Sequence, residues 1–265
     1  MRVRAGAASD VGAYRDVNQD AAFAAAWGAA VADGVGGGPS GDLASASLIH
    51  RLITAPGPVD SAEVLISRLR GANWDLGAHV RRDPALSGMA TTLTGVWLTT
   101  GGDLLLAHTG DSRGYLLRDG ILSRQTRDDS FVQELVDRGL VPPEDASTHP
   151  RRNIITASLG GHENDVVRVE TRDARVGDRW LLCSDGLTDY VPEDAVAEIL
   201  RGMSDPQAAA ARLVEFGLGA ASRDNITAVV CDVTADTVPP GAVPLLTGSA
   251  ASRFPEVIEA GWATA

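Results

Sequence analysis

The sequence predicts an α+β fold in which strands and helices form separate layers. Segments with the two-residue period of strands follow one another across short turns, whereas segments with helical spacing come in blocks. A βαβ fold would instead place a helix after nearly every strand. We therefore expect antiparallel sheets covered by helices.

The strand predictions rest on short alternating or apolar segments bounded by turn residues. Residues facing opposite sides alternate in 92–98, and 104–107 is an apolar run. Asp119-Gly120 separates two apolar pairs and predicts a tight hairpin over 116–122. Further strands are expected at 180–183 and 226–233.

The helix predictions rest on apolar residues spaced three or four apart. This spacing runs through 65–80. A second helix is expected to begin at Asp205-Pro206, because proline suits the first helical turn, and to direct Leu213 and Phe216 inward. Two further helices are expected at 43–54 and 132–138.

Composition narrows the class of protein. The 265 residues include 23 Lys and Arg against 35 Asp and Glu, and the net charge of −12 disfavours nucleic acid and anionic membranes as partners. Residues 1–10 lack the apolar core of a signal peptide, and no run approaches the ~18 apolar residues of a membrane span. Cys183 and Cys231 lie in apolar runs without zinc-site spacing. We expect a cytoplasmic monomer with reduced thiols.

The composition changes after Val233. Residues 234–265 contain Pro239-Pro240-Gly241 and Gly248-Ser249 and show weak periodicity. We therefore expect one domain over 1–233, followed by a loosely packed or disordered tail with at most a short terminal helix.

Four aspartates stand at the ends of predicted strands. Asp33, Asp111 and Asp185 each follow an apolar segment, and Asp224 precedes the last predicted strand. A strand end holds a carboxylate in place, and several such ends side by side would gather the acids. Because like charges repel, such a cluster favours divalent cations, and oxygen ligands suit Mg²⁺ or Mn²⁺.

Each of these residues also has a purely structural interpretation. Asp-Gly is a common hairpin turn, but Asp33-Gly34 is followed by Val35-Gly36-Gly37-Gly38, which is too glycine-rich for a simple hairpin. Asp224-Asn225 could be an ordinary turn. Arg15 could clamp a phosphate through bidentate hydrogen bonds, or could be an ordinary surface arginine.

Together these segments resemble the metal-dependent Ser/Thr protein phosphatases of type 2C, especially the compact bacterial members. Six motifs occur in the family's order over roughly residues 5–233. They are Ser9-Asp10-Val11-Gly12 with Arg15 and Asn18-Gln19-Asp20, Ala32-Asp33-Gly34-Val35-Gly36-Gly37, Gly88-Met89-Ala90-Thr91-Thr92, Gly110-Asp111-Ser112-Arg113, Ser184-Asp185-Gly186-Leu187-Thr188-Asp189, and Ser222-Arg223-Asp224-Asn225-Ile226-Thr227. A segment at about 124–160 is similar to the family's flap subdomain.

The resemblance implies a four-layer α-β-β-α sandwich of two antiparallel sheets flanked by helices. It implies two Mn²⁺ or Mg²⁺ ions bridged by Asp33, with Asp185 and Asp224 as further ligands of the first ion and the Gly34 carbonyl on the second. A third ion is implied near Asp111, which would share Asp185 with the first.

The resemblance also assigns roles around the ions. Arg15 would hold the substrate phosphate, and Asp20 would orient metal-bound water from an outer position, with Gln19 and Asn225 beside it. Catalysis would then depend on Arg15, Asp33 and Asp185, as water activated between the ions attacks phosphorus in line with the leaving Ser or Thr oxygen.

Two positions depart from the family pattern. Gln19 stands where some relatives carry a Glu that helps to hold the second metal, and a neutral amide binds a cation more weakly. Val35 stands where animal members place a His proposed as general acid, and valine has no proton to donate. We expect a neutral-to-alkaline pH optimum and a preference for Mn²⁺.

The resemblance thus predicts a protein phosphatase that acts on phosphorylated proteins and reverses a bacterial Ser/Thr kinase. Three alternatives stay open: a catalytically weak regulatory module that binds phosphoproteins, a metal-dependent phosphohydrolase of small molecules, and a protein in which every acid is only a turn residue.

Overall fold

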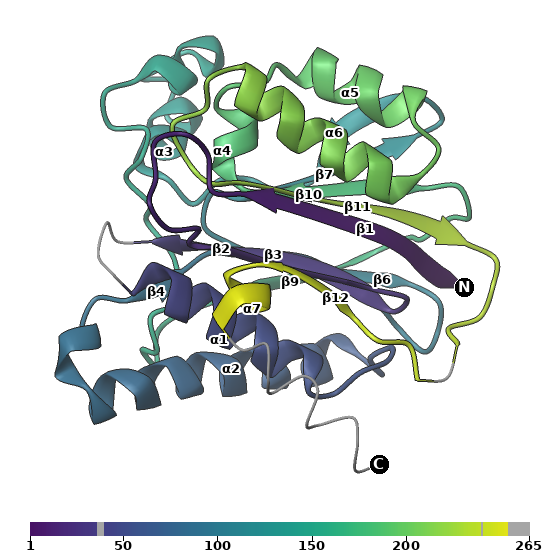
Figure 1. Ribbon diagram of the computed structural model, residues 1–265, viewed down its shortest axis with the longest axis horizontal. Helices are drawn as coiled ribbons and strands as arrows, with labels where there is room; N and C mark the ends of the chain where they lie inside the picture. Colours follow the sequence, from purple (N-terminus) through teal and green to yellow (C-terminus); the bar gives the residue numbers. More distant parts are fainter. Residues whose placement is uncertain (36–39, 240, 254–265) are drawn as a thin grey trace.

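Two antiparallel sheets pack face to face, and helices cover their outer surfaces (Figure 1). The computed structural model describes residues 1–35, 40–239 and 241–253. Gly36–Gly38 of the glycine-rich stretch, Pro240 and residues 254–265 of the expected tail lie outside the described residues. The predicted four-layer sandwich is confirmed.

The first sheet has the strand order β1-β11-β10-β7-β8. Its strands are β1 (Arg2–Asp10), β7 (Arg113–Arg118), β8 (Ile121–Arg124), β10 (Arg179–Cys183) and β11 (Ile226–Thr234). Its outer face is covered by α4 (Asp185–Thr188), α5 (Glu193–Gly202) and α6 (Pro206–Gly219) (Figure 1).

The second sheet has the order β12-β2-β3-β5-β6-β9, and β4 pairs with β3 off this path. Its strands are β2 (Asp20–Ala25), β3 (Gly28–Val35), β4 (Ala90–Thr91), β5 (Leu93–Leu98), β6 (Leu104–Thr109), β9 (Arg168–Arg172) and β12 (Leu245–Gly248). Its outer face is covered by α1 (Gly41–Ile53), α2 (Ala62–Arg82) and α7 (Ser249–Arg253) (Figure 1). The 3-10 turn η1 (Pro84–Leu86) follows α2.

The core lies in three apolar layers, one between the sheets and one under each set of helices. The layer between the sheets contains Trp180 and Val229 from the first sheet and Val31 and Leu106 from the second. Because helices cover the other faces, central strands are buried on both sides, and all six residues of β5 are buried. These buried strands hold the loops at one end of the sandwich rigidly.

The Asp119-Gly120 hairpin forms as predicted. Arg118 pairs with Ile121 across the turn, and both turn residues have positive φ, 52° for Asp119 and 78° for Gly120. Two consecutive positive φ values define the turn that matches the twist of a two-residue hairpin, which explains the Asp-Gly sequence.

Helix α6 begins at Pro206 as predicted, and the Ala208 amide donates to Asp205 Oδ2 at 2.8 Å. Leu213 is buried, but the prediction that Phe216 points inward is wrong, because its side chain is 37% exposed. The Phe216 ring instead lies 5.9 Å from the guanidinium of Arg212, one turn earlier. The apolar stripe of α6 is therefore narrower than the spacing indicated.

The segment from 124 to 160 is an excursion between β8 and β9. It contains α3 (Phe131–Asp137) and the 3-10 turn η2 (Pro143–Thr148). An isolated bridge between Ser130 and Ile155 joins two parts of the segment, and a second bridge, between Thr91 and Leu159, ties its end to β4. Its role as a flap stays a prediction.

The expected tail is partly a folded element. Residues 245–248 form β12, which pairs with β2 at the edge of the second sheet, and α7 packs on α1. A boundary at 233 is therefore too early for the folded part, and the expectation of a loosely packed tail is wrong for 245–253. Sequence periodicity missed this element because it is only nine residues long and its contacts are all distant in the chain.

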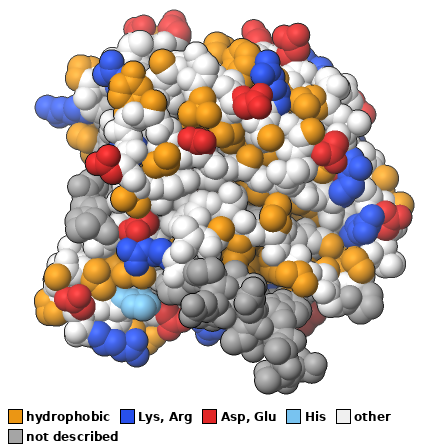
Figure 2. Space-filling view, viewed as in Figure 1, with side chains coloured by type: hydrophobic (Ala, Val, Ile, Leu, Met, Phe, Trp, Pro, Cys, Tyr) orange, Lys and Arg blue, Asp and Glu red, His pale blue; other side chains and the backbone are white. Residues whose placement is uncertain are grey.

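Acidic and basic side chains lie scattered among one another on the face shown in Figure 2. An extended basic surface of the kind that binds polyanions is not visible among the described residues of that face. Within the described parts of the chain, no helix combines the length and the apolar character needed to cross a bilayer.

Candidate active site

Asp20 and Asp33 come together at one end of the second sheet. They are direct partners in the β2–β3 register, and the charge of Asp20 raises the pKa of Asp33. The Ser184 hydroxyl, at the end of β10 in the other sheet, donates to Asp20 Oδ2 at 2.7 Å. This contact brings the ends of the two sheets to a common point.

The backbone of Asp33 is held by two threonines, Thr91 and Thr92, which end one of the family motifs. The Asp33 amide donates to Thr92 Oγ1 at 3.0 Å, and its carbonyl accepts from Thr91 Oγ1 at 2.9 Å. Thr92 Oγ1 also lies 2.8 Å from Ser112 Oγ, in the motif that contains Asp111. The Thr91-Thr92 and Asp111-Ser112 motifs therefore act as supports for Asp33.

The Asp185 and Asp224 segments meet through a close backbone contact. A Cβ on Gly186 would lie 1.9 Å from the Asn225 carbonyl oxygen, so only glycine fits behind Asp185. Asn225 is buried, and its side-chain amide donates to the carbonyls of Val11 and Val17 at 2.9 and 3.1 Å.

Asn225 also accepts a hydrogen bond from the Gln19 amide, with Oδ1 at 2.8 Å from the nitrogen. It therefore organises the 11–19 loop around the site. Its side-chain contacts are all made to backbone groups of that loop, and its outer position beside the ions stays a prediction.

The aspartates perturb one another strongly. Burial raises the pKa of Asp33 well above its usual range, and the charges of Asp20, Asp185, Asp111 and Asp224 raise it further. These causes place five carboxylates in one electrostatic cluster.

The other members of the cluster respond in the same direction. Burial, then the charges of Asp111 and Asp189, raises the pKa of Asp185. Burial is also the main cause that raises the pKa of Asp20 to about 6 and that of Asp111 to about 7. Such a cluster is stabilised by any cation that neutralises it.

Arg15 lies beside this cluster. One of its terminal nitrogens is 2.7 Å from Asp224 Oδ2, and its Nε donates to the Arg223 carbonyl at 3.4 Å. The guanidinium is about half exposed, which leaves donors available to an incoming anion.

Two carboxylate oxygens meet the requirements of a hard cation site. Asp111 Oδ1 and Asp185 Oδ1 are buried and have no hydrogen-bond partner. Among the described residues, however, no three His, Cys, Asp or Glu side chains are already arranged around one point. Asp224 instead forms an ion pair with Arg15. Binding of one metal ion by Asp33, Asp185 and Asp224 together stays a prediction.

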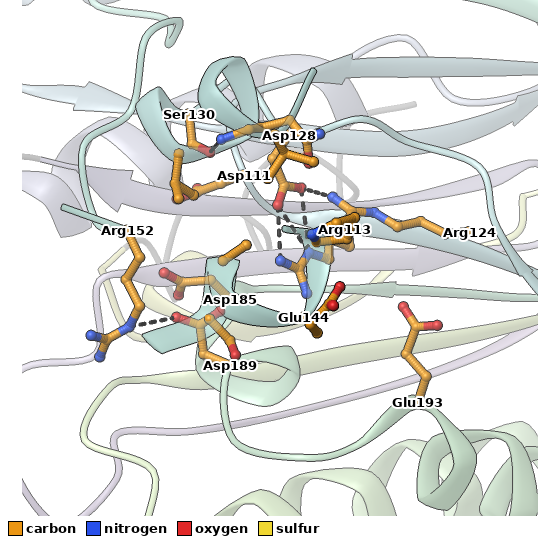
Figure 3. A pocket seen from close by; sticks show the side chains of 16 residues that line it. Asp111, Arg113, Arg124, Asp128, Ser130, Glu144, Arg152, Asp185, Asp189 and Glu193 are labelled. Atoms are coloured by element: carbon orange, nitrogen blue, oxygen red, sulfur yellow. Dashed lines mark hydrogen bonds and ion pairs between the residues drawn. The ribbon is translucent and has the colours of Figure 1, made fainter. Parts of the chain in front are cut away.

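A cavity of about 530 Å³ adjoins Asp111 and Asp185 (Figure 3). Asp189 borders it one helical turn after Asp185, and Arg152, from the 124–160 segment, lies 3.4 Å from Asp189 (Figure 3). The predicted site residues do not include Asp189, although a spacing of four on a helix places it beside Asp185.

The protein phosphatase 2C family matches residues 14–216. The chain belongs to this family. Its relatives include the serine/threonine protein phosphatase PstP of Mycobacterium tuberculosis, which is 45% identical over 235 residues, 87% of this chain and 45% of that protein. The serine/threonine phosphatase stp of Listeria monocytogenes is 33% identical over 76% of this chain and 82% of that protein. The chain thus spans about half the length of PstP.

Solved structures of 2C phosphatases share this fold. The M. tuberculosis PstP/Ppp structure superposes with a TM-score of 0.83 at 42% identity, over 88% of this chain and 100% of that one. The catalytic domain of PstP in complex with two manganese ions gives a TM-score of 0.80 at 42% identity, over 88% of this chain and 99% of that one. The family resemblance predicted from the motifs is therefore confirmed.

The two departures from the 2C pattern can be located in the fold. Gly34, whose carbonyl is a predicted ligand, packs so tightly that a Cβ would lie 2.3 Å from the Gly41 carbonyl oxygen. The Gln19 amide group packs at the same place, 3.0 Å from where a Gly41 Cβ would be. Gln19 therefore lies next to the predicted second-ion position, and Val35 ends β3 just beyond it.

Proposed function

We propose that this chain is a metal-dependent phosphatase that hydrolyses phosphoserine and phosphothreonine in proteins. One observation carries the proposal: a cluster of buried and half-buried aspartates lies beside the partly exposed guanidinium of Arg15, which is 2.7 Å from Asp224. Carboxylates alone repel a phosphate dianion, so the cluster suits this substrate only with cations bound. The naming of PstP and stp as Ser/Thr phosphatases supports the same reaction.

The predicted ligands are Asp33, Asp185, Asp224 and the Gly34 carbonyl for two Mn²⁺ or Mg²⁺ ions, with Asp111 for a third. The manganese complex of the PstP catalytic domain supports this choice of metal. Bound ions supply neutralisation of phosphoryl charge and a water of lowered pKa. Asp111 and Asp185 each have a buried oxygen without a hydrogen-bond partner, and Asp189 lies beside them. We therefore include Asp189 among the residues around the third ion.

The chain's own groups then orient the substrate. Arg15 donates hydrogen bonds to two equatorial phosphate oxygens, because its planar fork matches them, while Asp224 holds the guanidinium from behind. Asp20, held by Ser184, orients the attacking water by accepting its hydrogen bond. Val35 cannot protonate the leaving Ser or Thr oxygen, so that proton comes from solvent.

The partners follow from this reaction. We assign as substrates proteins phosphorylated by a bacterial Ser/Thr kinase, and we assign the chain to the cytoplasm as a monomer. Cys183 and Cys231 support a reducing compartment, because both are buried and unpaired.

The test compares a phosphothreonine peptide, p-nitrophenyl phosphate and a nucleotide as substrates, with Mn²⁺ and with EDTA. We expect Mn²⁺-dependent hydrolysis that favours the peptide and is lost in Asp33→Asn. The matched control is Asp119→Asn, an acid-to-amide change in the hairpin turn, which should leave the rate unchanged. A preference for the nucleotide would favour a small-molecule phosphohydrolase, and Mn²⁺ binding without hydrolysis would favour a phosphoprotein-binding module.

A further inference from the structure

The segment Leu245–Arg253, which we name the C-terminal clamp, consists of β12 and α7. It lies beyond residue 216, where the family match ends. β12 runs antiparallel to β2, from Leu245 opposite Ala24 to Gly248 opposite Ala21. Strand β12 therefore ends next to Asp20, at the site.

The turn between β12 and α7 is pressed against the Asp20 backbone. Gly248 has a positive φ of 66°, and a Cβ there would lie 2.2 Å from the Asp20 carbonyl oxygen. Both the conformation and the contact require glycine. This close approach delivers the next residue, Ser249, to the same carbonyl.

Ser249 belongs to a pair of buried serines that hold two consecutive carbonyls. The Ser249 hydroxyl donates to the Asp20 carbonyl at 3.0 Å, and Ser45 Oγ, on α1, donates to the Gln19 carbonyl at 2.5 Å. The two hydroxyl oxygens are 2.9 Å apart. Ser249 is 1% exposed, so water does not replace its hydrogen bond.

Helix α7 also anchors α1, whose first residues pack behind the predicted ligand Gly34. The Ala250 carbonyl lies 2.8 Å from His50 Nε2, and Arg253 Nε donates to Asp42 Oδ2 at 2.5 Å. The clamp thus joins β2, where Asp20 is paired with Asp33, to α1, which packs behind Gly34.

We propose that the C-terminal clamp positions the metal centre, with Ser249 as a positioning residue that acts through the backbone of Gln19 and Asp20. The inference rests on the proposed function. Buried carboxylates that repel one another move apart unless their backbone is held, and a site that has relaxed in this way binds cations more weakly. The clamp opposes that relaxation from the outer side of β2.

The experiment measures Mn²⁺ affinity by calorimetry on the EDTA-stripped full chain, together with kcat and KM for p-nitrophenyl phosphate and the melting temperature. The variants are Ser249→Ala and Ser45→Ala, which remove one hydroxyl from each side. Losing one buried hydrogen bond should weaken Mn²⁺ binding about three- to tenfold and lower kcat, with KM unchanged. In the double variant, the losses should be smaller than the product of the single losses, because the two serines form one network.

Ser252→Ala is the matched control, because it removes an exposed hydroxyl from the same helix. It should change neither Mn²⁺ affinity nor kcat. If Ser249→Ala and Ser45→Ala lower the melting temperature but keep Mn²⁺ affinity and kcat within about twofold of the parent, the clamp only completes the sheet and the inference is overturned. If the parent chain itself binds no Mn²⁺, the proposed function fails as well. Mn²⁺ binding by the parent therefore distinguishes failure of the clamp inference from failure of the proposed function.

Discussion

Asp20 and Asp33 lie directly opposite each other on β2 and β3, where Asp20 is buried and Asp33 is half-buried. Burial and a neighbouring negative charge both favour the protonated form of each acid. Without bound cations, the two carboxylates repel each other when both are ionised, and the rigid sheet keeps them from moving apart. The first two predictions follow from that repulsion.

Stability without metal should fall as the pH rises. The pKa of Asp20 is raised from its ordinary 3.8 to about 6, so the folded state binds more protons than the unfolded state between these values. The stabilising effect of protonation is present below about pH 4 and is lost as the pH passes about 6. For Asp20 alone the loss is on the order of 3 kcal/mol.

Urea unfolding in EDTA between pH 4 and pH 8 measures this dependence. Asp20→Asn should flatten it, because an amide carries no charge to repel Asp33. An exposed acid gives the control: Asp119→Asn should retain the parent's pH dependence. If the free energy of unfolding depends on pH in the same way in Asp20→Asn and in the parent, Asp20 is not the source of the pH dependence.

Cations and protons should compete for the same carboxylates. Burial raises the pKa of Asp111 to about 7, so activity should fall on the acidic side as this group and Asp20 become protonated. Because cation binding displaces protons, each tenfold increase in Mn²⁺ should move the acidic limb down by up to about one pH unit. Profiles of kcat/KM against pH at several Mn²⁺ concentrations test this prediction. An acidic limb that stays at the same pH at every Mn²⁺ concentration, as the titration of a protein imidazole would, contradicts it.

Arg15→Ala should lower kcat/KM for a phosphothreonine peptide about ten- to a hundredfold, because hydrogen bonds from a charged group to phosphate are lost. Arg15→Lys should retain only part of the parent's kcat/KM, since lysine lacks the planar guanidinium that can donate two parallel hydrogen bonds. Arg212→Ala removes an exposed arginine paired with Glu215 on α6 and should behave as the parent. Full activity in Arg15→Ala would exclude Arg15 from phosphate binding.

Asn225→Ala should destabilise the fold by about 2–4 kcal/mol, because three buried hydrogen bonds to Val11, Val17 and Gln19 are lost together. Weaker Mn²⁺ binding should accompany the loss, since these bonds shape the loop that carries Arg15. Denaturant unfolding and calorimetry measure both effects. The exposed Asn153→Ala is the comparison, and equal stability of the two variants would remove Asn225 from this role.

Much of the site was predictable from local sequence. Asp33, Asp111 and Asp185 end apolar segments, and strand ends are recognisable because burial imposes a short apolar run. The Asp119-Gly120 hairpin and the start of α6 at Pro206 depend on backbone preferences of one or two residues, and both predictions were right. The family resemblance added the fold's four layers, since motif order carries information that periodicity lacks.

Contacts between distant segments set the rest. Neither the Ser184 hydrogen bond to Asp20, across 164 residues, nor the Ser249 bond to the same residue, across 229, leaves a pattern in the local sequence. The exposure of Phe216 depends on how α6 is rotated against its sheet. Residues 245–253 looked like a tail because a short edge strand gains its stability from the strand it joins. Propensity and spacing act over a few residues, whereas the pairing of β12 with β2 exists only once the sheet has folded.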